Sequence, residues 1–260
     1  MMTNGQITGL VHYPVKGLSG QTLPAVQLSP GQGFPFDRMF GFARAGSGFD
    51  PSNPAPMPKD KFLMLMRDER LAGLASRFDP VSRVLELNVQ GNRVHHADLS
   101  TPDGCAATEA FFARMFDLAS DKMPSFVHAD PHRFTDVSVV STDLMNAVSL
   151  INLDSIADLE VKTGASIAPE RFRANIYFRG WPAFSELDLV GQEISIGSAR
   201  ARVTLRTRRC AATEANPTTA RRDLPIPRLL LQHYGHSDMG IYAEIIGGAS
   251  IGPGDSMSLA

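Results

Sequence analysis

The sequence contains only two cysteines, Cys105 and Cys210, among 260 residues. They are too few and too far apart to form the disulfide framework that small secreted domains use. The opening residues Met-Met-Thr-Asn-Gly show no basic segment followed by an apolar stretch, as a secretory signal would. We therefore expect a reduced protein in the cytoplasm.

Long apolar runs and an excess of one charge are also absent. The densest apolar stretch, residues 62–66, is far shorter than the ~20 residues that a membrane-spanning helix requires, so we expect no membrane insertion. The 25 basic and 27 acidic side chains nearly balance, which disfavours a polycation for nucleic acid and an acidic tail. An apolar fraction of 43% can fill one large domain or two ordinary ones.

The first half has the pattern of a β-rich region. Segments with strand composition end at turn residues in 7–13, 25–28 and 39–43. Residues 45–60 contain four prolines, which predicts a long surface loop that is either flexible or a lid. Apolar spacing in 105–118 predicts a helix. Breaks near Pro124 and Pro131 divide the chain into residues 1–128 and 129–260.

The second half mixes strands with a few helices. A strand at 137–140 would lead through Ser141 and Thr142 into a helix that reaches Leu150. A helix is also predicted from Asp154 to Val161 and another from Pro225 to Tyr234, with strands at 174–178, 193–196, 201–205, 241–246 and 257–259. Helices do not regularly separate the strands, so the pattern favours a β-rich α+β fold, with a barrel and peripheral helices, over a doubly wound sheet.

Arginine is concentrated in residues 200–222, where Glu214 is the only acidic residue. A planar guanidinium group suits bidentate binding of phosphate or carboxylate, so this segment predicts an anion site, with a solvated basic edge as the alternative. Few aromatic residues alternate with the arginines, which disfavours a nucleic-acid surface. The arginines are Arg200, Arg202, Arg206, Arg208, Arg209, Arg221 and Arg222.

Cys210 directly follows Arg208 and Arg209. Neighbouring cations favour the thiolate, which can act as a nucleophile or as a metal ligand. A lone cysteine is more commonly a small buried hydrophobic residue, and this alternative stays open. Cys105 has only glycine and alanine beside it, so we expect it to pack at the start of a helix.

Five short motifs occur in order along nearly the whole chain. No single one is specific, but in this order and spacing the chain resembles the MOSC family, the molybdenum cofactor sulfurase C-terminal domain proteins. It is similar in particular to the mitochondrial amidoxime-reducing component and its bacterial relatives. The motifs are Tyr13-Pro14-Val15-Lys16-Gly17, Phe36-Asp37-Arg38, Arg171-Phe172-Arg173-Ala174-Asn175-Ile176, Arg209-Cys210 and Ile251-Gly252-Pro253-Gly254-Asp255.

The resemblance implies a MOSC-type β-barrel after an N-terminal β-rich domain, with a molybdenum–molybdopterin cofactor between them. Cys210 would be the protein ligand to molybdenum, since a thiolate is a soft ligand that suits such a metal. Lys16 and Arg38 would contact the cofactor, and Arg208 and Arg209 would supply cations for its phosphate. For Lys16 and Arg38 the alternatives are a surface lysine and an ordinary ion pair.

Four further residues complete the predicted site. Arg173 and Asn175 alternate on one face of a predicted strand, so both can reach one ligand, and the resemblance assigns them to the pterin and phosphate. Ser141 and Thr142 would bind an anion at a helix start, or serve only as an ordinary cap. Asp136 would be a proton donor or acceptor near the metal, or a turn residue.

The implied reaction is the two-electron reduction of an N-hydroxylated substrate such as an amidoxime or hydroxylamine. The chain has neither an iron–sulfur cysteine segment nor a dinucleotide-binding glycine motif, so electrons would come from a separate cytochrome, flavodoxin or ferredoxin. The alternative is a sulfur carrier or cofactor-handling protein with a persulfide on Cys210. We expect a monomer that binds neither nucleic acid nor membranes.

The chain departs from the relatives at positions that leave the substrate open. Gly17 stands where many relatives carry serine, and Thr207-Arg208 replaces a Cys-Pro pair. The segment Asn216-Pro217-Thr218-Thr219-Ala220 only approximates the relatives' Asp-Pro-Xaa-Thr-Gly.

Overall fold

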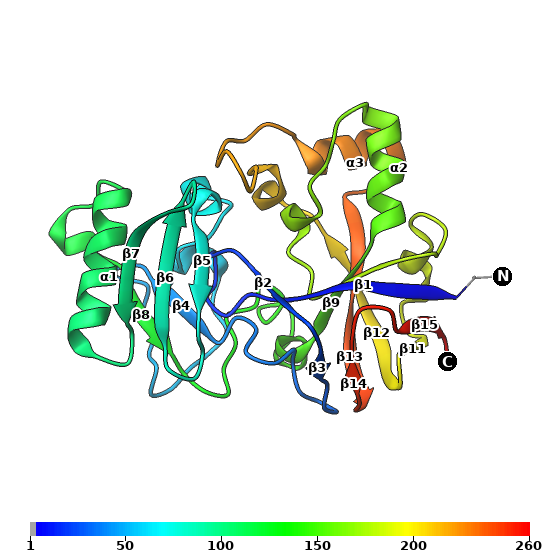
Figure 1. Ribbon diagram of the computed structural model, residues 1–260, viewed down its shortest axis with the longest axis horizontal. Coiled ribbons are helices and arrows are strands. Elements are labelled where there is room, and N and C mark those ends of the chain that lie inside the picture. The colour runs from blue at the N-terminus through cyan, green and yellow to red at the C-terminus, as the bar shows by residue number, and fades with distance from the viewer. Residues whose placement is uncertain (1–3) are drawn as a thin grey trace.

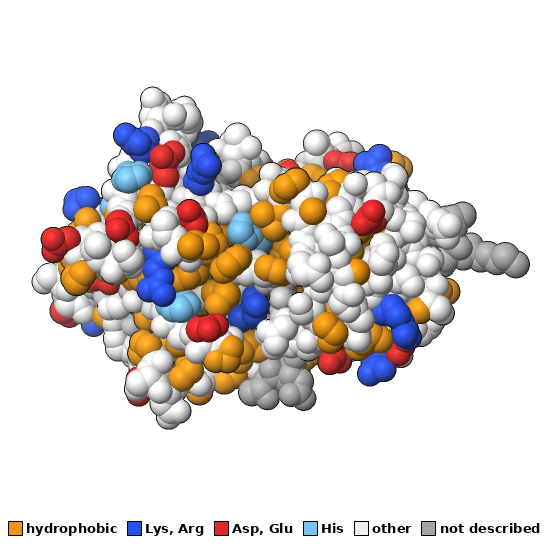
Figure 2. Space-filling view, turned by 60° about the horizontal axis from the view of Figure 1, so that its bottom comes forward, with side chains coloured by type: hydrophobic (Ala, Val, Ile, Leu, Met, Phe, Trp, Pro, Cys, Tyr) orange, Lys and Arg blue, Asp and Glu red, His pale blue; other side chains and the backbone are white. Residues whose placement is uncertain are grey.

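The computed structural model describes residues 4–260, except for the side chains of Thr142 and Asp143. The chain forms a β-barrel, on the right in Figure 1, and a smaller β-rich unit beside it on the left. On the face shown in Figure 2, basic and acidic side chains are interspersed, in keeping with the balanced composition. In the described part of the chain no helix is both long and apolar enough to span a bilayer.

The barrel is a sheet that closes on itself. Its strand order is β10-β9-β13-β12-β11-β15-β1-β2, and β1 also pairs with β10, so seven strands form a ring and β2 lies outside it. Only the β9–β10 pair of this ring is parallel. A closed ring leaves no unpaired edge. The strands are β1 (Gly5–His12), β2 (Gln21–Leu23), β9 (Val148–Asn152), β10 (Ile176–Arg179), β11 (Glu193–Ile196), β12 (Ala199–Arg208), β13 (Asp238–Gly247) and β15 (Ser256–Leu259).

Alternating side chains fill the barrel. Along β12, Ala201 and Val203 are buried while Arg200 and Arg202 are exposed, as the two-residue period of a strand requires. Inward residues of the other strands, including Leu150 and Ile176, join the same apolar cluster. Burial of this apolar surface supplies the main driving force for folding, at ~25 cal/mol per Å².

The smaller unit combines two short sheets with one helix. β4 (Phe40–Ala43) pairs with β8 (Ser125–His128), and a second sheet contains β5 (Ala75–Phe78), β6 (Val84–Val89) and β7 (Asn92–Asp98). Helix α1 (Pro102–Met115) packs on β7 and β8, with Phe112 against Phe42 in the core. The Thr101 hydroxyl caps the helix by accepting a hydrogen bond from the Gly104 amide, and Pro102 occupies the first helical position. Both features are typical of a helix start.

Two helices cover the outside of the barrel at the top right of Figure 1. α2 (Leu153–Thr163) begins at Asn152, whose side chain accepts a hydrogen bond from the Asp154 amide, and ends at Gly164 in the left-handed conformation. α3 (Ile226–Tyr234) begins after Pro225. Tyr234 donates a hydrogen bond to Asp158 of α2 at 2.6 Å. A further two-stranded sheet joins β3 (Val26–Gln27) and β14 (Ser250–Ile251).

The predicted β-rich α+β fold, with a barrel and peripheral helices, is confirmed. The prediction for residues 137–150 is wrong. Residues 137–140 form turns, and the expected helix is replaced by the short 3-10 turn η4 (Thr142–Asn146) followed by β9. All five residues of β9 are buried. A short apolar run covered on both faces has no alternation, so its period does not distinguish a strand from a helix.

The barrel also takes a strand from the N-terminal part of the chain, and the proline-rich loop is attached to the molecule by an aromatic residue. β1 belongs to the barrel, although it lies in the N-terminal segment 1–128, because Ile7 and Leu10 enter the barrel core. The proline-rich residues 45–58 contain no helix or strand, and the 3-10 turn η1 (Lys59–Lys61) follows them. Phe49 of this loop packs edge-on against Phe62 and Phe134, so the loop is attached to the molecule at an aromatic cluster.

Candidate functional site

A cavity of about 310 Å³ lies where the barrel meets the smaller unit. It is lined from several directions: by the segment after β1, by the end of β12, and by η5 (Pro169–Phe172) with the residues that follow it. Eight of the ten predicted site residues line this one cavity, although they come from distant parts of the sequence. They are Lys16, Arg38, Asp136, Arg173, Asn175, Arg208, Arg209 and Cys210.

Cys210 lies between β12 and the 3-10 turn η7 (Ala211–Glu214), in extended backbone conformation. Its thiol is free and partly exposed, so it is not a residue of the apolar core. The Lys59 ammonium donates a hydrogen bond to its sulfur at 3.3 Å. The sulfur is therefore both accessible and in contact with a cation.

Asp136 connects two lysines at the cavity wall. The buried Lys16 pairs with one of its oxygens and donates a second hydrogen bond to the Phe134 carbonyl at 2.8 Å. Lys59 Nζ lies 3.4 Å from the other oxygen. Desolvation alone would raise the pKa of Asp136, but Lys16 and then Lys59 outweigh it and hold the pKa far below its ordinary value. The ionised carboxylate therefore holds both lysines at the cavity wall, and its role as a proton donor or acceptor stays a prediction.

Arg38 is held by the carboxylate of Asp37 and by the backbone carbonyl of Arg173. Its guanidinium pairs with Asp37 and also donates to the Arg173 carbonyl at 3.0 Å. Asp37 in turn accepts a hydrogen bond from the Tyr13 amide at 2.8 Å. Burial lowers the pKa of Arg38, but the Asp37 charge outweighs it and the pKa lies above its ordinary value, so a full positive charge is kept inside the site.

Arg173 and Asn175 lie just before β10 rather than on it. Arg173 has a left-handed backbone, with φ of 53°, and its guanidinium stacks over the Tyr13 ring at 4.3 Å. Burial and then the Arg38 charge lower the pKa of Arg173 to about 10, which still leaves it charged at neutral pH. The expected alternation on one strand face is therefore wrong, because η5 ends at Phe172 and β10 begins only at Ile176, so neither residue lies on a strand.

The Asn175 side-chain amide, just before β10, connects β9 and β1 by hydrogen bonds. Its oxygen accepts hydrogen bonds from the Ser149 amide at 3.1 Å and hydroxyl at 2.8 Å, and its nitrogen donates to the Val11 carbonyl at 3.2 Å. Ser149 belongs to β9 and Val11 to β1. The side chain thus fixes the wall of the cavity at the point where β1, β9 and β10 meet.

The arginine-rich segment divides once it is folded. The strand period places Arg200, Arg202, Arg206 and Arg208 on the exposed face of β12, where the first two pair with Glu193 and Arg206 pairs with Asp188. Arg209 follows the strand and turns inward. It donates to the Met239 carbonyl at 2.7 Å and to the Phe172 carbonyl at 2.9 Å. Clustering in the sequence therefore does not mean a single arginine cluster in space.

Three buried donors around the cavity lack a hydrogen-bond acceptor among the residues that the structure describes. They are Nη2 of Arg209, Oγ1 of Thr207 and Nε of Arg171. A buried donor without a partner costs roughly 1–3 kcal/mol. An acceptor-rich ligand in the cavity would remove that cost, so these atoms are an observation in favour of a bound anionic or carbonyl-bearing group.

Two departures from the relatives can now be placed. Gly17 has φ of 86°, and a Cβ there would lie 3.0 Å from the Leu63 carbonyl, so the local backbone requires glycine. Thr207, which stands in place of a cysteine, is buried and lines the cavity.

Ser141 does not line this cavity, although its neighbour Val140 does. The turn η4 is five residues long and is not the helix start that we predicted. The Thr142 side chain lies outside the described residues, so its predicted role stays a prediction.

Two residues that complete the cavity were not predicted from the sequence. Lys59 ends a loop that we had considered only as a possible lid, and nothing in a single sequence connects it to Cys210. Tyr242 of β13 also lines the cavity, and burial raises the pKa of its hydroxyl. Only the pairing of β13 with β9 and β12 brings that ring to the site.

Within residues 4–260 no three His, Cys, Asp or Glu side chains gather closely enough to hold a metal ion.

Comparison with known proteins identifies the family. The family model described as the MOSC domain matches residues 128–258, just over half of the chain. No curated protein matches. Among solved structures the chain is similar to the YUAD protein from Bacillus subtilis, with 13% identity, 99% of this chain and 96% of that chain covered, and a TM-score of 0.45. It is also similar to YiiM from Geobacillus stearothermophilus, with 21% identity, 44% and 53% coverage, and a TM-score of 0.34. The chain belongs to the MOSC domain family, which is associated with binding of the molybdenum cofactor.

Proposed function

We propose that this protein is a molybdenum cofactor-dependent oxidoreductase that reduces N-hydroxylated substrates of the amidoxime or hydroxylamine type. The observation that carries the proposal is the position of Cys210, a free thiol in a cavity lined by cationic side chains. Buried hydrogen-bond donors around this cavity have no acceptor among the described residues. A thiolate is a soft metal ligand, and the described residues offer no competing metal cluster.

The residues of the cavity fit the cofactor in charge and in hydrogen bonding. Cys210 would be the single protein ligand to the metal. The guanidinium groups of Arg38 and Arg173 and the ammonium of Lys16 would face the anionic phosphate. Arg209 and Thr207 would satisfy their unpaired donors on acceptors of the pterin or phosphate. When bound, the cofactor would supply the two-electron redox chemistry.

The chain itself would hold charge and geometry for the reaction. Asp136 holds the ammonium groups of Lys16 and Lys59, each through a different carboxylate oxygen. Lys59 keeps a hydrogen-bond donor next to the sulfur, where it could also bind an oxygen of a ligand at that position. These groups are preorganised, so little reorganisation is needed when negative charge develops beside Cys210.

Electrons would come from a separate redox protein of the cytochrome, flavodoxin or ferredoxin type. The sequence contains neither an iron–sulfur cysteine segment nor a dinucleotide-binding glycine motif. The chain would therefore act as the substrate-reducing half of a two-protein system.

The test compares wild type, Cys210→Ala and the matched control Cys105→Ala. Each purified protein is assayed for molybdenum by elemental analysis and for reduction of benzamidoxime with a chemical electron donor. We expect Cys210→Ala to lose turnover and most of its molybdenum, while Cys105→Ala keeps both. Equal occupancy and turnover in all three proteins would refute the assignment. A cyanide-labile sulfur on Cys210, without molybdenum or turnover, would favour a sulfur carrier instead.

A further inference from the structure

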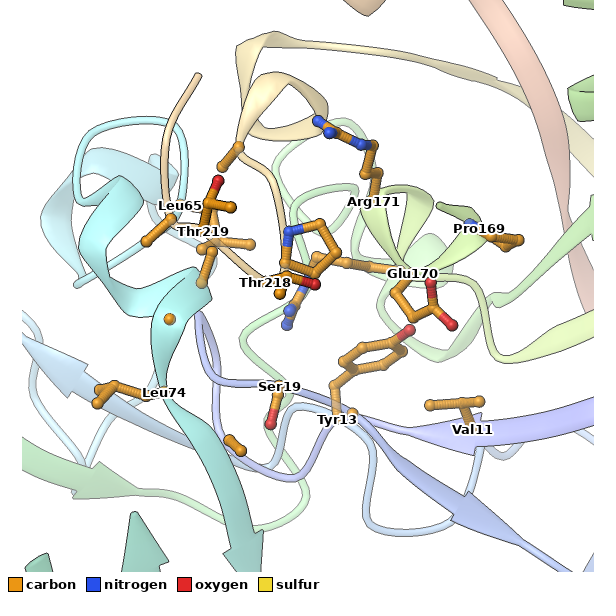
Figure 3. Close-up of a pocket in the computed structure, with 18 of the residues that line it drawn as sticks. Val11, Tyr13, Ser19, Leu65, Leu74, Pro169, Glu170, Arg171, Thr218 and Thr219 are labelled. Atoms are coloured by element: carbon orange, nitrogen blue, oxygen red, sulfur yellow. The ribbon is translucent and has the colours of Figure 1, made fainter. Parts of the chain in front are cut away.

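A second cavity, of about 1240 Å³, adjoins the first between the barrel and the smaller unit. In Figure 3, Tyr13 and Val11 lie toward the bottom of the view, Pro169 and Glu170 of η5 on the right, and Thr218 and Thr219 on the left. Both cavities are lined by the same five residues, which therefore separate or connect them. These are Gly17, Leu65, Arg171, Arg173 and Ala212.

The lining of this interdomain cleft is mainly apolar, with Val11, Leu65, Leu74 and Met115 among its residues. The Tyr13 hydroxyl is already hydrogen-bonded to that of Tyr177 at 3.0 Å, so the tyrosine offers the cleft mainly its ring. An apolar wall with few available polar groups favours the apolar part of a small molecule.

Most charged groups along the cleft are already engaged. Arg171 pairs with Asp223, Arg173 donates to the Leu18 carbonyl, and Arg70 lies 3.6 Å from Asp117. The exposed Glu170 and Arg221 also line the cleft. They would face solvent or the polar end of a ligand, because an unpaired charge is costly against apolar surface.

The two walls of the cleft are fixed to each other. Arg222 donates to the Met66 carbonyl of the smaller unit at 2.7 Å and to the Ala211 carbonyl, next to Cys210, also at 2.7 Å. Across the same contact, a Cβ on Gly73 would lie 3.1 Å from that of Ala220. The cleft is therefore preformed, which reduces the entropy lost when a ligand binds.

Its size and position relate the cleft to the smaller cavity. At about 310 Å³ the cavity at Cys210 is at the low end of the range for ligand pockets, ~300–1,000 Å³, so a cofactor would fill it and leave no room for a bulky substrate. Ala212, two residues after Cys210, lines both spaces. The cleft is thus the large apolar volume next to the reacting position.

We propose that the interdomain cleft binds the apolar body of the substrate, so that the enzyme prefers N-hydroxylated compounds with an extended alkyl or aryl group. This inference rests on the proposed function. Each methylene that becomes buried is expected to tighten binding about fourfold. Affinity should therefore rise steeply with the length of an apolar tail.

The experiment measures binding of benzamidoxime, 4-propylbenzamidoxime and 4-hexylbenzamidoxime to the molybdenum-loaded protein by calorimetry. No electron donor is present, so binding is separated from turnover. We expect the hexyl compound to bind at least tenfold more tightly than benzamidoxime. Two variants fill the cleft from opposite walls, Thr218→Trp and Ala75→Trp, and both replace exposed residues, so the fold should be kept.

The two tryptophan variants should lose the dependence on chain length. The control Val161→Trp, on a helix surface that is 83% exposed and lines neither cavity, should keep it. Equal affinity for the three compounds in wild type, or an unchanged dependence in both cleft variants, overturns the inference. Reduction of benzamidoxime without chain-length dependence leaves the proposed function standing, and graded binding without any reduction refutes that function alone.

Discussion

Lys59 Nζ lies 3.3 Å from the sulfur of Cys210, although 151 positions of sequence separate the two residues. The same ammonium lies 3.4 Å from Asp136. The loop that carries Lys59 is attached through Phe49 to the aromatic cluster with Phe134, two residues from Asp136. The proline-rich loop is therefore part of the site wall, because it brings a cation to the thiol.

The first prediction concerns the charge that Lys59 places at the thiol. In cofactor-free protein, anionic iodoacetate should alkylate Cys210 faster relative to neutral iodoacetamide than a free thiol would, because Lys59 attracts the anion. Lys59→Met should lower this rate ratio about fivefold, the effect of losing ~1 kcal/mol of attraction at about 4 Å. Mass spectrometry of the Cys210 peptide measures both rates.

Lys61 is the matched control, since it lies in the same 3-10 turn but does not line the cavity. Lys61→Met should leave the ratio unchanged. A ratio that is equal in wild type and Lys59→Met would show that the lysine does not act on reagents at the sulfur.

The sequence predicts much of this site because the residues that form it belong to short local motifs. Lys16, Arg173 and Cys210 each follow or precede a barrel strand, so a correct barrel brings these three to one cavity. Arg38 reaches the same cavity from the segment before β4 of the smaller unit. Lys59 could not be found in this way. Its position depends on how Phe49 packs, and a tertiary contact of a loop leaves no periodic pattern in the sequence.

The predictions for the segments that form β12 and β9 also depended on the periodic pattern of each strand. The number of arginines in residues 200–222 suggested one anion site, but the strand period turns Arg200 and Arg202 to solvent, away from the cavity. Arg206, Arg208 and Arg209, at the end of the strand and just beyond it, do line the cavity. For β9 the period was absent, because all five residues are buried. The alternation of apolar and polar residues therefore identifies a strand such as β12, which has one exposed face, but not a strand such as β9, which is buried on both faces.

A second prediction follows from Arg209, which combines two backbone hydrogen bonds with one unpaired buried nitrogen. Arg209→Lys keeps the charge but not the planar fork, so it cannot make both bonds and still reach a ligand. We expect molybdenum occupancy to fall at least tenfold and stability to fall by ~1–3 kcal/mol. Elemental analysis and urea unfolding measure the two effects.

Arg202 provides the comparison for that variant, since it is exposed on β12 and does not line the cavity. Arg202→Lys should change stability by no more than ~0.5 kcal/mol, as surface substitutions usually do, and should keep its molybdenum. Equal loss in both variants would mean that the two arginines act only as a diffuse positive charge.

The third prediction concerns the dependence of stability on pH through Asp136. The pKa of Asp136 is lower in the folded protein than in the unfolded chain, so its ionic contacts stabilise the fold fully above the unfolded value of ~4 and are lost as the pH falls toward the folded value. Because the side chain is about half exposed, we expect Asp136→Asn to cost only ~1–2 kcal/mol at pH 7. This cost should shrink steadily below pH 4, because the unfolded wild-type chain then binds a proton at Asp136 that the folded protein does not. Urea unfolding of both proteins between pH 3 and pH 7 measures this difference in stability.

Asp121→Asn is the control, because it removes only an exposed pair with Lys122, and it should show almost no cost at any pH. A constant difference for Asp136→Asn across that range would mean that the loss comes from packing and not from the charge between the two lysines.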